Sequence, residues 1–500
     1  MVQFFRMRVT VIGTGYVGTV TGACLAYLGH TVTCVDTDAT KIAKLQRREM
    51  PIYEPHLAEL VGEAAVRGGI DFTTELSQAA ADSDVIFIAV GTPPHPNGEA
   101  NLTYLESAAR GIGGAMDSSR FRVVVNKSTV PVGCGNLVEA LLHEGIRAAR
   151  PTEEKRIRFG VASNPEFLRE GCAIADSLYP ERIVVGAEEE RTLETLRELY
   201  RPLVEQTFEA PAFLPRPAAV GRVPLVTTTL TSAEMIKYAA NTFLAVKIGF
   251  ANEVANLCER VGADSTEVMA GIGLDSRIGS KFLNAGLGWG GSCFGKDIQS
   301  LLHTAEEYGY NARLLEAALA VNRAQRQVII QKLQEKLFIL KGRTIALLGL
   351  AFKPDTDDLR DAPSLQIAER LVQLGARVKA YDPIVMPACR EQNPGLRIQF
   401  CESALDAASE ADAVVLVTEW DEFRRIDLPA MAAVMQQPVL VDGRNMFDPE
   451  TARAAGFNYS GIGRSPRMRT TPNARATAPP DTRSGVSAHV MVPLLDGSAK

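Results

Sequence analysis

The chain has 500 residues, too many for a single hydrophobic core, so its size predicts two to four domains. Its formal net charge of -6 gives no bulk attraction to nucleic acid, and no apolar run is long enough for a membrane-spanning helix. Eight irregularly spaced cysteines without a Cys-x-x-Cys pair favour a reducing compartment over disulfides or a zinc site. Because the start of the chain also lacks the long apolar run of a signal peptide, we expect a cytoplasmic protein without a metal site.

The first predicted elements are typical of a dinucleotide-binding fold. A β-branched strand, 8–12, leads into Gly13-Thr-Gly-Tyr-Val-Gly18, an apolar helix, and a second strand that ends at Asp36. The first glycine makes the tight turn, the second admits a pyrophosphate, and the third lets the helix pack on the sheet. Asp36 would accept a hydrogen bond from a ribose hydroxyl and repel a 2′-phosphate, so NAD is predicted rather than NADP.

The alternation of strands and helices continues through the first third of the chain. Three further strands are predicted at 84–90, 121–126 and 158–162. Ligands lie outside the carboxyl ends of such strands, so Thr92, Ser128 and Thr129 would line a cleft. The alternative is that these residues only belong to proline-stabilised turns.

Two carboxylates follow the last of these strands. Glu166 and Glu170 are expected in the first turns of a helix after Pro165, either as ordinary acids favoured by the helix dipole or as residues that face the cleft. The Arg- and Glu-rich stretch 147–158 is expected to be a solvated insertion. The segment 211–224 carries four prolines and, together with a helix before it at 188–200, is expected to mark the end of the first domain.

A long helix is predicted from Ser232, its N-cap, to Val261, with Gly262 as its stop. Lys237 and Asn241 are four residues apart and therefore share one face of it. A helix lysine is ordinarily solvent-facing, but the neighbours of this one are nearly all apolar. If it is buried, Lys237 needs an anionic partner or an oxyanion that develops during a reaction.

The stretch from Gly288 to Asp297 presents a cysteine in a glycine-rich loop. Cys293 is followed by a helical pattern at 298–308, so the thiol is expected near a helix N-terminus. Backbone N–H groups, the helix dipole and a lysine would lower the pKa of the thiol and make a thiolate nucleophile. The alternative is a buried cysteine in a tight turn.

The last third is predicted to form a second parallel α/β sheet. A basic amphipathic helix, 322–340, joins the halves, and the strand 344–350 that follows ends without the dinucleotide glycine spacing, so this lobe should not bind NAD as the first does. The other elements expected are strands at 377–381, 413–418 and 438–441 and a helix at 364–374. The Pro-, Ser-, Thr- and Arg-rich stretch 466–500 is expected to be disordered.

These motifs together resemble the family of UDP-glucose and GDP-mannose dehydrogenases, which oxidise the C6 alcohol of a nucleotide sugar to an acid with two NAD. The motifs that carry the resemblance span about residues 7 to 463: Gly13 to Gly18 with Asp36, Lys127-Ser-Thr-Val-Pro, Asn164-Pro-Glu-Phe-Leu, Lys237 with Asn241, Gly290-Gly-Ser-Cys-Phe-Gly-Lys-Asp297 and Phe352-Lys353. The insertions and the tail fall outside it. The resemblance implies two Rossmann-like doubly wound parallel-sheet domains joined by a long central helix and a helical middle domain.

The resemblance also implies a mechanism. Cys293 would hold the aldehyde as a thiohemiacetal, which is oxidised to a thioester and hydrolysed. Lys237 would stabilise the oxyanion and take the first proton, Asp297 would assist as base or orienter, and Asn241 would be a polar anchor. Thr129 and Glu166 would position the hydrolytic water.

Ligand-binding residues and domain limits follow from the same resemblance. Residues expected to bind NAD are Gly13, Gly15, Tyr16, Val17, Gly18, Asp36, Lys41, Thr92, Ser128, Glu170, Lys296 and Arg360. Residues expected to bind the nucleotide sugar are Glu166, Phe167, Leu168, Lys237, Asn241, Arg277, Phe282, Gly290, Phe352, Lys353 and Arg444, with Arg277 reaching across the interface of a homodimer or higher oligomer. Lys353 and Arg444 suit a diphosphate, although each could also be an exposed loop charge. The expected domains are 1–215 for NAD, 225–330 for the helical centre and 341–465 for the UDP-sugar.

UDP-glucose is the expected substrate, because Phe294 and the stretches 243–245 and 256–259 favour it within the family. Three alternatives remain open at this point. One is a sister enzyme acting on GDP-mannose or a UDP-N-acetylhexosamine; another is a one-step hydroxyacid dehydrogenase, which needs no thiol; the third is a nucleotide-sugar sensor without turnover.

Overall fold

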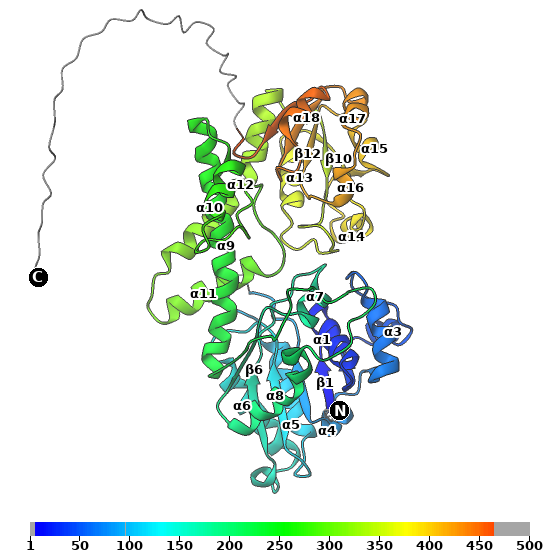
Figure 1. Ribbon diagram of the computed structural model, residues 1–500, viewed down its shortest axis with the longest axis vertical. Helices are drawn as coiled ribbons and strands as arrows, with labels where there is room; N and C mark the ends of the chain where they lie inside the picture. Colours follow the sequence, from blue (N-terminus) through cyan, green and yellow to red (C-terminus); the bar gives the residue numbers. More distant parts are fainter. Residues whose placement is uncertain (1–5, 96, 465–500) are drawn as a thin grey trace, which may run out of the picture.

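The computed structural model describes residues 6–95 and 97–464, which form two α/β lobes connected by helices (Figure 1). The long helix α9 (Leu230–Val261) runs beside both lobes and is followed by the other central helices. These are α10 (Ser265–Gly273), α11 (Phe294–Glu307) and α12 (Arg313–Leu337). Within the described ranges, no helix combines the length and the apolar character needed to cross a membrane. The tail predicted at 466–500 lies outside the described residues.

The first lobe is built on an eight-stranded sheet in the order β3-β2-β1-β4-β5-β6-β7-β8, parallel except for the β6–β7 pair. Its strands are β1 (Arg8–Ile12), β2 (Thr31–Val35), β3 (Ile70–Thr73), β4 (Val85–Ile88), β5 (Arg122–Asn126), β6 (Phe159–Ser163), β7 (Ile183–Ala187) and β8 (Leu225–Thr228). Its helices are α1 (Tyr16–Tyr27), α2 (Ala39–Gln46), α3 (Leu57–Arg67), α4 (Leu76–Asp82), α5 (Thr103–Ala115), α6 (Cys134–Ala149), the 3-10 turn η1 (Glu154–Arg156), α7 (Ala173–Leu178) and α8 (Glu190–Glu205). The central strands are buried throughout because helices cover both faces of the sheet, which is why they are continuous apolar runs in the sequence.

The second lobe repeats this order of connections in a smaller sheet, β11-β10-β9-β12-β13-β14, in which every pair of strands is parallel. Its strands are β9 (Thr344–Leu348), β10 (Arg377–Tyr381), β11 (Ile398–Phe400), β12 (Ala413–Leu416), β13 (Val439–Asp442) and β14 (Asn458–Gly461). Its helices are α13 (Pro363–Gln373), α14 (Met386–Gln392), α15 (Ala404–Ala408), α16 (Asp421–Arg424), α17 (Leu428–Val434) and α18 (Pro449–Ala454). The architecture of two Rossmann-type lobes predicted from the sequence is confirmed.

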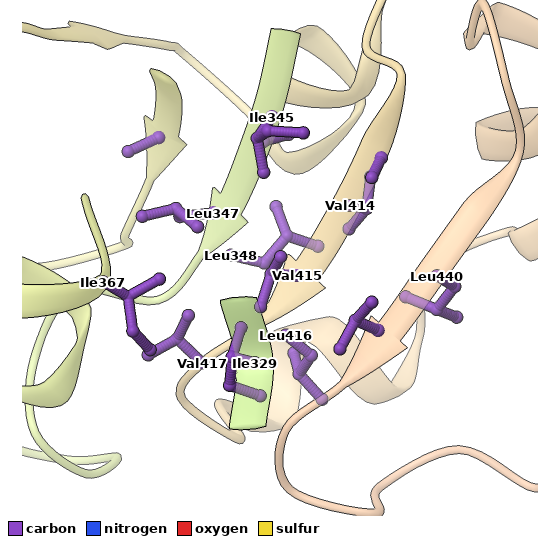
Figure 2. Packing of buried hydrophobic residues seen from close by; sticks show 14 of the residues in the cluster. Ile329, Ile345, Leu347, Leu348, Ile367, Val414, Val415, Leu416, Val417 and Leu440 are labelled. Carbon is purple, nitrogen blue, oxygen red and sulfur yellow. The ribbon is translucent and has the colours of Figure 1, made fainter. Parts of the chain in front are cut away.

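The connecting helix α12 is part of the core of the second lobe. Ile329 of α12 packs with Ile345, Leu347 and Val415 on the sheet, in one continuous buried cluster (Figure 2). The helix begins at Arg313, nine residues before the predicted start, because apolar residues ahead of Asn322 pack against α9 and α11.

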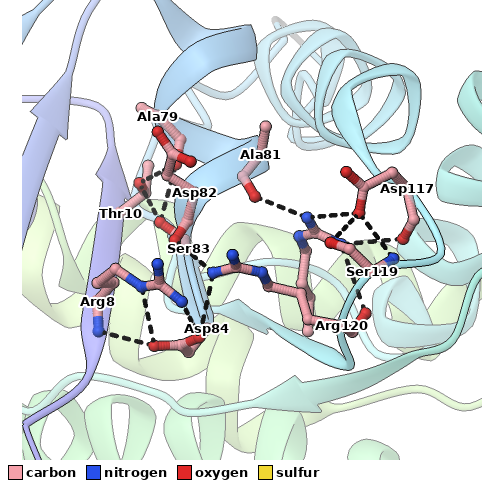
Figure 3. A network of polar contacts seen from close by, with 11 residues as sticks. Arg8, Thr10, Ala79, Ala81, Asp82, Ser83, Asp84, Asp117, Ser119 and Arg120 are labelled. Atoms are coloured by element: carbon pink, nitrogen blue, oxygen red, sulfur yellow. Dashed lines mark hydrogen bonds and ion pairs between the residues drawn. The ribbon is translucent and has the colours of Figure 1, made fainter.

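A polar network connects the starts of several first-lobe strands (Figure 3). Asp84 accepts from the main-chain N–H of Arg8 at 3.0 Å and from its guanidinium at 3.1 Å, and it also pairs with Arg120 at 3.6 Å. The buried guanidinium of Arg122 donates to Ala81 O and to the Asp117 carboxylate. These contacts join β1 and β5 to the loops that precede β4 and β5.

Four boundary predictions need correction. The N-cap of α9 is Thr229, whose hydroxyl accepts from the Ser232 N–H; Ser232 lies inside the helix. The helix after Cys293 starts at Phe294 instead of 298. The segment 211–224 has neither helix nor strand, as predicted, but the first sheet continues beyond it because β8 pairs with β7. The residues from Pro165 to Glu170 are not helical, because Lys237, Lys353 and Thr356 hold them in an irregular loop.

Candidate active site

The glycine turn after β1 forms an open cradle at the N-terminus of α1. Gly13 has a φ of +98°, which favours glycine, and its N–H donates to Val35 O at 2.7 Å. A Cβ on Gly18 would lie 1.8 Å from Gly13 O, so only glycine lets the helix approach the turn. Gly15 has open space where its Cβ would be, and it caps α1 without a side-chain hydrogen bond. The first N–H groups of the helix therefore face a space suited to a diphosphate.

Asp36 lies at the end of β2 beside this turn. Its carboxylate accepts from the Thr14 N–H at 2.8 Å and from the Asp38 N–H at 3.0 Å, and Lys41 Nζ lies 3.3 Å from it. Burial alone would raise its pKa, but these hydrogen bonds and the lysine together lower it, so the side chain is ionised. The predicted neighbours Asp36 and Lys41 are thus brought together with the turn.

The predicted residues Tyr16 and Val17 are the first two residues of α1. The Tyr16 hydroxyl donates to the buried Glu54 carboxylate and accepts from the Gly171 N–H at 2.8 Å. Glu54 also accepts from the Ala173 N–H at 2.7 Å, at the start of α7. The glycine turn is therefore connected to the loop that carries Glu166 and Glu170.

The loops after β4 and β5 meet at the same edge of the sheet. The Thr92 hydroxyl donates to Thr129 O at 2.7 Å, and the Ser128 hydroxyl donates to Val90 O at 2.7 Å. The two loops hold each other through these bonds, so the predicted group Thr92, Ser128 and Thr129 is one contiguous part of the structure.

A buried charged cluster lies on the face of α9 that turns toward this edge. Lys237 Nζ is 2.7 Å from Glu166 Oε1, and both side chains are buried. Asn241, one turn further along, donates to Asp297 at 2.6 Å, and Lys296 Nζ lies 2.8 Å from the other oxygen of Asp297. The prediction that a buried Lys237 has an anionic partner is confirmed, with Glu166 as that partner.

The charge state of Lys237 decides between its two expected roles. Burial would lower its pKa, but the carboxylates of Glu166 and then Asp297 outweigh burial and raise the pKa of Lys237 above its usual value. An ammonium that remains protonated can stabilise an oxyanion but cannot accept a proton. The raised pKa therefore favours the ammonium form of Lys237, which is the form that an oxyanion would need.

Cys293 is the N-cap residue of α11, so the thiol lies at a helix N-terminus, as predicted, and it is exposed. The predicted lowering of its thiol pKa is wrong for the protein without ligands. Loss of hydration raises the pKa of Cys293, and the charge of Glu166 raises it further, although Lys237 opposes both. Burial of the sulfur, followed by the carboxylates of Glu166 and Asp297, thus favours the neutral thiol over the thiolate, against the single opposing charge of Lys237.

Buried side chains of α12 hold the cysteine loop in place. Asn322 accepts from the Trp289 N–H at 2.8 Å and donates to Trp289 O at 3.0 Å. Arg326 donates to Trp289 O at 3.1 Å and pairs with Asp361 of the second lobe at 2.9 Å. The loop is consequently anchored to both the central helices and the second lobe.

The loop that carries Glu166 also reaches the second lobe. Glu170 accepts from the Thr356 hydroxyl at 2.7 Å, and its main-chain oxygen accepts from Lys353 Nζ at 2.5 Å. Arg360 lies 3.5 Å from the Glu170 carboxylate and 2.8 Å from Asp358. Burial and then the charge of Asp358 raise the pKa of Glu170 to about 7. These contacts form a latch between the lobes, defined here as Glu170 with Lys353, Thr356 and Arg360.

The predicted sugar-nucleotide residues fall into three groups, of which the first two lie near the cysteine loop and beside Lys237. Gly290 lies in the cysteine loop, and Phe352 and Arg444 lie beside it. Arg444 donates to Gly288 O at 3.1 Å and to Phe352 O at 3.2 Å, and it pairs with Glu419 at 3.1 Å. Arg444 is therefore occupied by protein contacts, as Lys353 is in the latch. Phe167 lies with its ring centroid 5.5 Å from Lys237 Nζ, while Leu168 donates its N–H to Glu166.

Arg277 and Phe282 lie on the connection between α10 and α11, apart from the charged cluster in their contacts. Arg277 is exposed and pairs only with Asp275 among the described residues. Phe282 has a φ of +64°, unusual for a residue with a side chain, so its backbone is held in a strained conformation.

Residue-by-residue reasoning missed three kinds of contributor. Lys127 was visible only as part of a motif, but its ammonium lies close enough to Glu166 to lower the pKa of that carboxyl. Glu54, which joins the glycine turn to α7, had no local signal in the sequence. Asn322 and Arg326 were visible as polar residues within an amphipathic helix, and only the packing shows that they are buried against the cysteine loop.

Three family models match consecutive parts of the chain. The NAD binding domain of the UDP-glucose/GDP-mannose dehydrogenase family matches residues 7–204, its central domain matches 231–324, and its UDP binding domain matches 346–449. Together these matches cover most of the chain and follow the order of the first lobe, the central helices and the second lobe.

Curated proteins and solved structures agree with these matches. The chain is 45% identical to the UDP-glucose 6-dehydrogenase TuaD of Bacillus subtilis, over 95% of both chains. It is 46% identical to the UDP-glucose 6-dehydrogenase of Rhizobium meliloti, over 92% of this chain and all of the relative. A UDP-glucose dehydrogenase structure from Pyrobaculum islandicum is similar with a TM-score of 0.82 and 37% identity, covering 93% of this chain and 99% of that one.

Proposed function

We infer, from the premise that the chain belongs to the UDP-glucose/GDP-mannose dehydrogenase family, that it is an NAD-dependent UDP-glucose 6-dehydrogenase. The product is then UDP-glucuronate, formed by removal of four electrons at C6. The observation that carries this function is the convergence of an exposed thiol, Cys293, with the buried Lys237–Glu166 pair, in a chain whose first lobe has an NAD-type glycine turn. Similarity to proteins named as UDP-glucose 6-dehydrogenases supports the choice of substrate.

NAD suits the first lobe. The open space at Gly15 and the uncapped start of α1 would admit its diphosphate, and the ionised Asp36 would accept from an adenosine ribose hydroxyl. When bound, NAD supplies the hydride acceptor for each oxidation. We assign Thr92, Ser128 and Lys296 to the same ligand, with Glu170 and Arg360 contacting it from the latch.

The side chains then divide the chemistry among them. The Lys237 ammonium stabilises negative charge on the C6 oxygen, both in the alcohol oxidation and in the later tetrahedral intermediates. The Cys293 sulfur adds to the aldehyde carbon to give a thiohemiacetal, and loss of hydride and of the hydroxyl proton leaves a thioester. Water then attacks the thioester carbon, the carbon–sulfur bond breaks, and the thiolate takes up a proton as the acid leaves.

The remaining polar groups of the cluster would orient these steps. Asp297 is buried and receives hydrogen bonds from Asn241 and Lys296, so it is placed to hold those side chains and to assist proton transfer. Thr129 and Glu166 would position the hydrolytic water. Because the thiol pKa of Cys293 is raised, the bound ligands must bring positive charge to the sulfur before it reacts, since further loss of water would raise that pKa again.

We propose three domains with separate roles: residues 1–215 bind NAD, residues 225–330 provide the thiol and the subunit contacts, and residues 341–465 bind the UDP-sugar. Strand β8 belongs to the sheet of the first domain. In the last of these, Phe352, Lys353 and Arg444 would hold the uridine and the diphosphate. Lys353 and Arg444 would exchange their present carbonyl partners for phosphate oxygens, which accept stronger, charge-assisted bonds.

We also propose a homodimer built on α9. Phe243, Phe250 and Leu257 recur every seven residues along this helix and are each more than half exposed, at 66%, 52% and 57%. A stripe of large apolar side chains at this spacing is typical of a helix that packs against another helix. Arg277, which is exposed nearby in sequence, would reach the partner's sugar site. None of the eight cysteines forms a disulfide, which supports a reducing, cytoplasmic location.

A panel of nucleotide sugars, with NADH counted per sugar consumed, tests the function. UDP-glucose should give two NADH per molecule, whereas turnover restricted to GDP-mannose or a UDP-N-acetylhexosamine would assign a sister activity. One NADH per molecule would indicate a hydroxyacid dehydrogenase, and no NADH with any sugar would indicate a sensor. Size-exclusion chromatography with light scattering tests the dimer, since Leu257→Glu should give monomers if the α9 stripe is the interface.

Cys293→Ser tests the covalent step. A serine hydroxyl is a poorer nucleophile and acyl carrier at neutral pH, so the variant should stall after the first oxidation or hold the sugar as an unreactive adduct. Mass spectrometry of the protein and NADH counting distinguish these outcomes. Complete double oxidation by this variant would show that another residue is the nucleophile.

A further inference from the structure

The first residue after β5, Lys127, has a charge to which the thioester chemistry gives no role. Its Nζ donates to Asn164 Oδ1 at 2.9 Å and lies 3.5 Å from Asn164 O. Asn164 is itself fixed, because its amide donates to Val184 O at 2.7 Å and its Oδ1 also accepts from the Tyr200 hydroxyl at 2.6 Å. The lysine is therefore held at one place in the structure.

That place is beside the catalytic cluster. Asn164 is two residues before Glu166 and begins the loop that carries both Glu166 and Glu170. The Glu166 carboxylate, in turn, forms the ion pair with Lys237 at 2.7 Å. Lys127 thus supports the backbone from which Glu166 reaches the catalytic lysine.

Lys127 differs from Lys237 and Lys296 in having no carboxylate of its own. In the part of the chain that the structure describes, its ammonium takes part in no ion pair, and its hydrogen bonds go to the neutral Asn164. Burial, opposed by Glu166 and assisted by repulsion from Lys237, lowers the pKa of Lys127 to about 8. These two are the charged groups that act on it, from the 164–171 loop and from α9. Its charge therefore changes close to neutral pH, while that of Lys237 does not.

We propose that Lys127 is a positioning residue of the reaction, whose ammonium fixes Asn164 at the start of the Glu166 loop and adds, besides Lys237, a second positive charge that acts on Glu166. This role rests on the proposed function, because it concerns the same thiol. With Lys127 protonated, the negative charge of Glu166 is shared between two ammonium groups, and less of it opposes the thiolate. Above about pH 8 the second charge is lost and the thiol becomes harder to ionise.

Alkylation of Cys293 by iodoacetamide, followed by mass spectrometry of the peptide that contains it, tests this role. The measurement needs neither NAD nor sugar, so it is independent of turnover and of the proposed substrate. Peptide analysis also separates Cys293 from Cys172, the other exposed cysteine. In the wild-type protein the logarithm of the rate should rise with pH and show a break near pH 8, where Lys127 loses its charge.

Two variants separate charge from hydrogen bonding. Lys127→Gln retains a donor for Asn164 without the charge, and it should react about threefold more slowly at pH 7.5, which corresponds to about half a pKa unit. Lys127→Arg retains the charge at every accessible pH, so it should react within about twofold of wild type and lose the break near pH 8. Lys155→Gln, an exposed position in η1, is the matched control and should leave the profile unchanged.

Turnover gives a second readout in the holoenzyme. Lys127→Gln should lower kcat and shift the acidic limb of the kcat–pH profile to higher pH. The KM for UDP-glucose should stay within about twofold of wild type. A profile for Lys127→Gln identical to wild type overturns the role, as does an arginine variant as slow as the glutamine variant. If neither variant folds, a wild-type alkylation profile with a single ionisation between pH 6 and 10 overturns it. Loss of UDP-glucose turnover in the wild type overturns only the proposed function, since the alkylation result remains interpretable.

Discussion

The two lobes use the same turn and the same acidic residue for different purposes. Gly13 and Gly349 both have a φ near +95°, and each donates its N–H to the last residue of the neighbouring second strand, at 2.7 and 2.8 Å. Asp36 and Asp382 follow those strands, and each accepts from the N–H of the residue after the glycine, at 2.8 and 2.7 Å. Two lobes with unlike ligands therefore share one local framework.

What differs is the residue that covers the acid. In the second lobe Trp420, four residues after β12, donates its indole N–H to Asp382 at 3.0 Å. The Asp382 carboxylate also accepts hydrogen bonds from the main-chain N–H groups of Ala351, Ile384 and Val385. Asp382 is fully buried. The position equivalent to Trp420 in the first lobe is Thr92, four residues after β4, which turns to Thr129 instead. The acid is thus enclosed by protein groups in the second lobe, whereas in the first lobe we propose that it binds the ligand.

Removing the buried acid should have the largest effect. Asp382→Ala leaves four main-chain N–H groups and an indole without their acceptor in a buried site, and it should lower the stability of the second lobe by about 4 kcal/mol. Hydrogen exchange of peptides covering 349–351 and 382–385 measures this locally. Asp36→Ala is the matched variant and should cost the first lobe about 1 kcal/mol. Equal losses in the two lobes would contradict the distinction.

For NAD affinity, the first-lobe variant should show the larger effect. Asp36→Ala removes the acceptor for a ribose hydroxyl, so NAD affinity should fall about thirtyfold, or about 2 kcal/mol, and discrimination against NADP should weaken. Fluorescence titration with both dinucleotides measures this. Trp420→Ala, in the other lobe, should leave the Kd for NAD unchanged. A similar loss of NAD affinity in both variants would mean that the effect arises from stability alone.

The free energy of unfolding should depend on pH through Glu170, which lies at the junction of the lobes. Its pKa is about 7 in the folded protein against 4.5 for an ordinary carboxyl, so the folded state binds the proton more tightly. Stability from this group is fully present below about pH 4.5 and falls as the pH rises to about 7, by about 3 kcal/mol. The difference in unfolding free energy between wild type and Glu170→Gln, measured from pH 5 to 7.5, should follow this fall. A difference independent of pH would show that the latch is not sensitive to this proton.

The smallest effects are expected where the lobes are most alike. Asp84 and Asp412 each precede the fourth strand of their sheet and accept from the N–H at the start of the first strand, Arg8 or Thr344, at 3.0 and 2.8 Å. Asp412 is the more buried of the two. Asp412→Ala should therefore cost about 1 kcal/mol and Asp84→Ala about 0.5 kcal/mol, measured by urea unfolding. The reverse order would show that burial does not set the strength of this contact.

Local patterns were sufficient for most of the fold. The β-branched strands with glycine turns and the long helix ending at Gly262 are present, because each depends on residues that are neighbours in the chain. The wrong boundary predictions arose where the nearby sequence allows two local structures. Thr229 was available as a cap three residues before Ser232, and the sequence after Pro165 satisfies a helix start as well as the loop that forms.

The candidate site divides in the same way. Residue types and spacing identified the thiol loop, the glycine turn and the helix lysine, whereas the pKa of Cys293 depends on Glu166 and Lys237, which are far from it in the chain. Lys353 and Arg444 were identified by position, but nothing local indicated that carbonyl oxygens hold both in the protein without ligands.

The sequence by itself determined the two lobes and the motifs of the proposed site, because periodicity, turn glycines and residue types act over short distances. The tertiary structure alone decided which charges are paired. Glu166 neutralises Lys237, Trp420 covers Asp382, and Lys127 is left without a carboxylate, since electrostatic free energies depend on distance and burial between residues that only folding brings together.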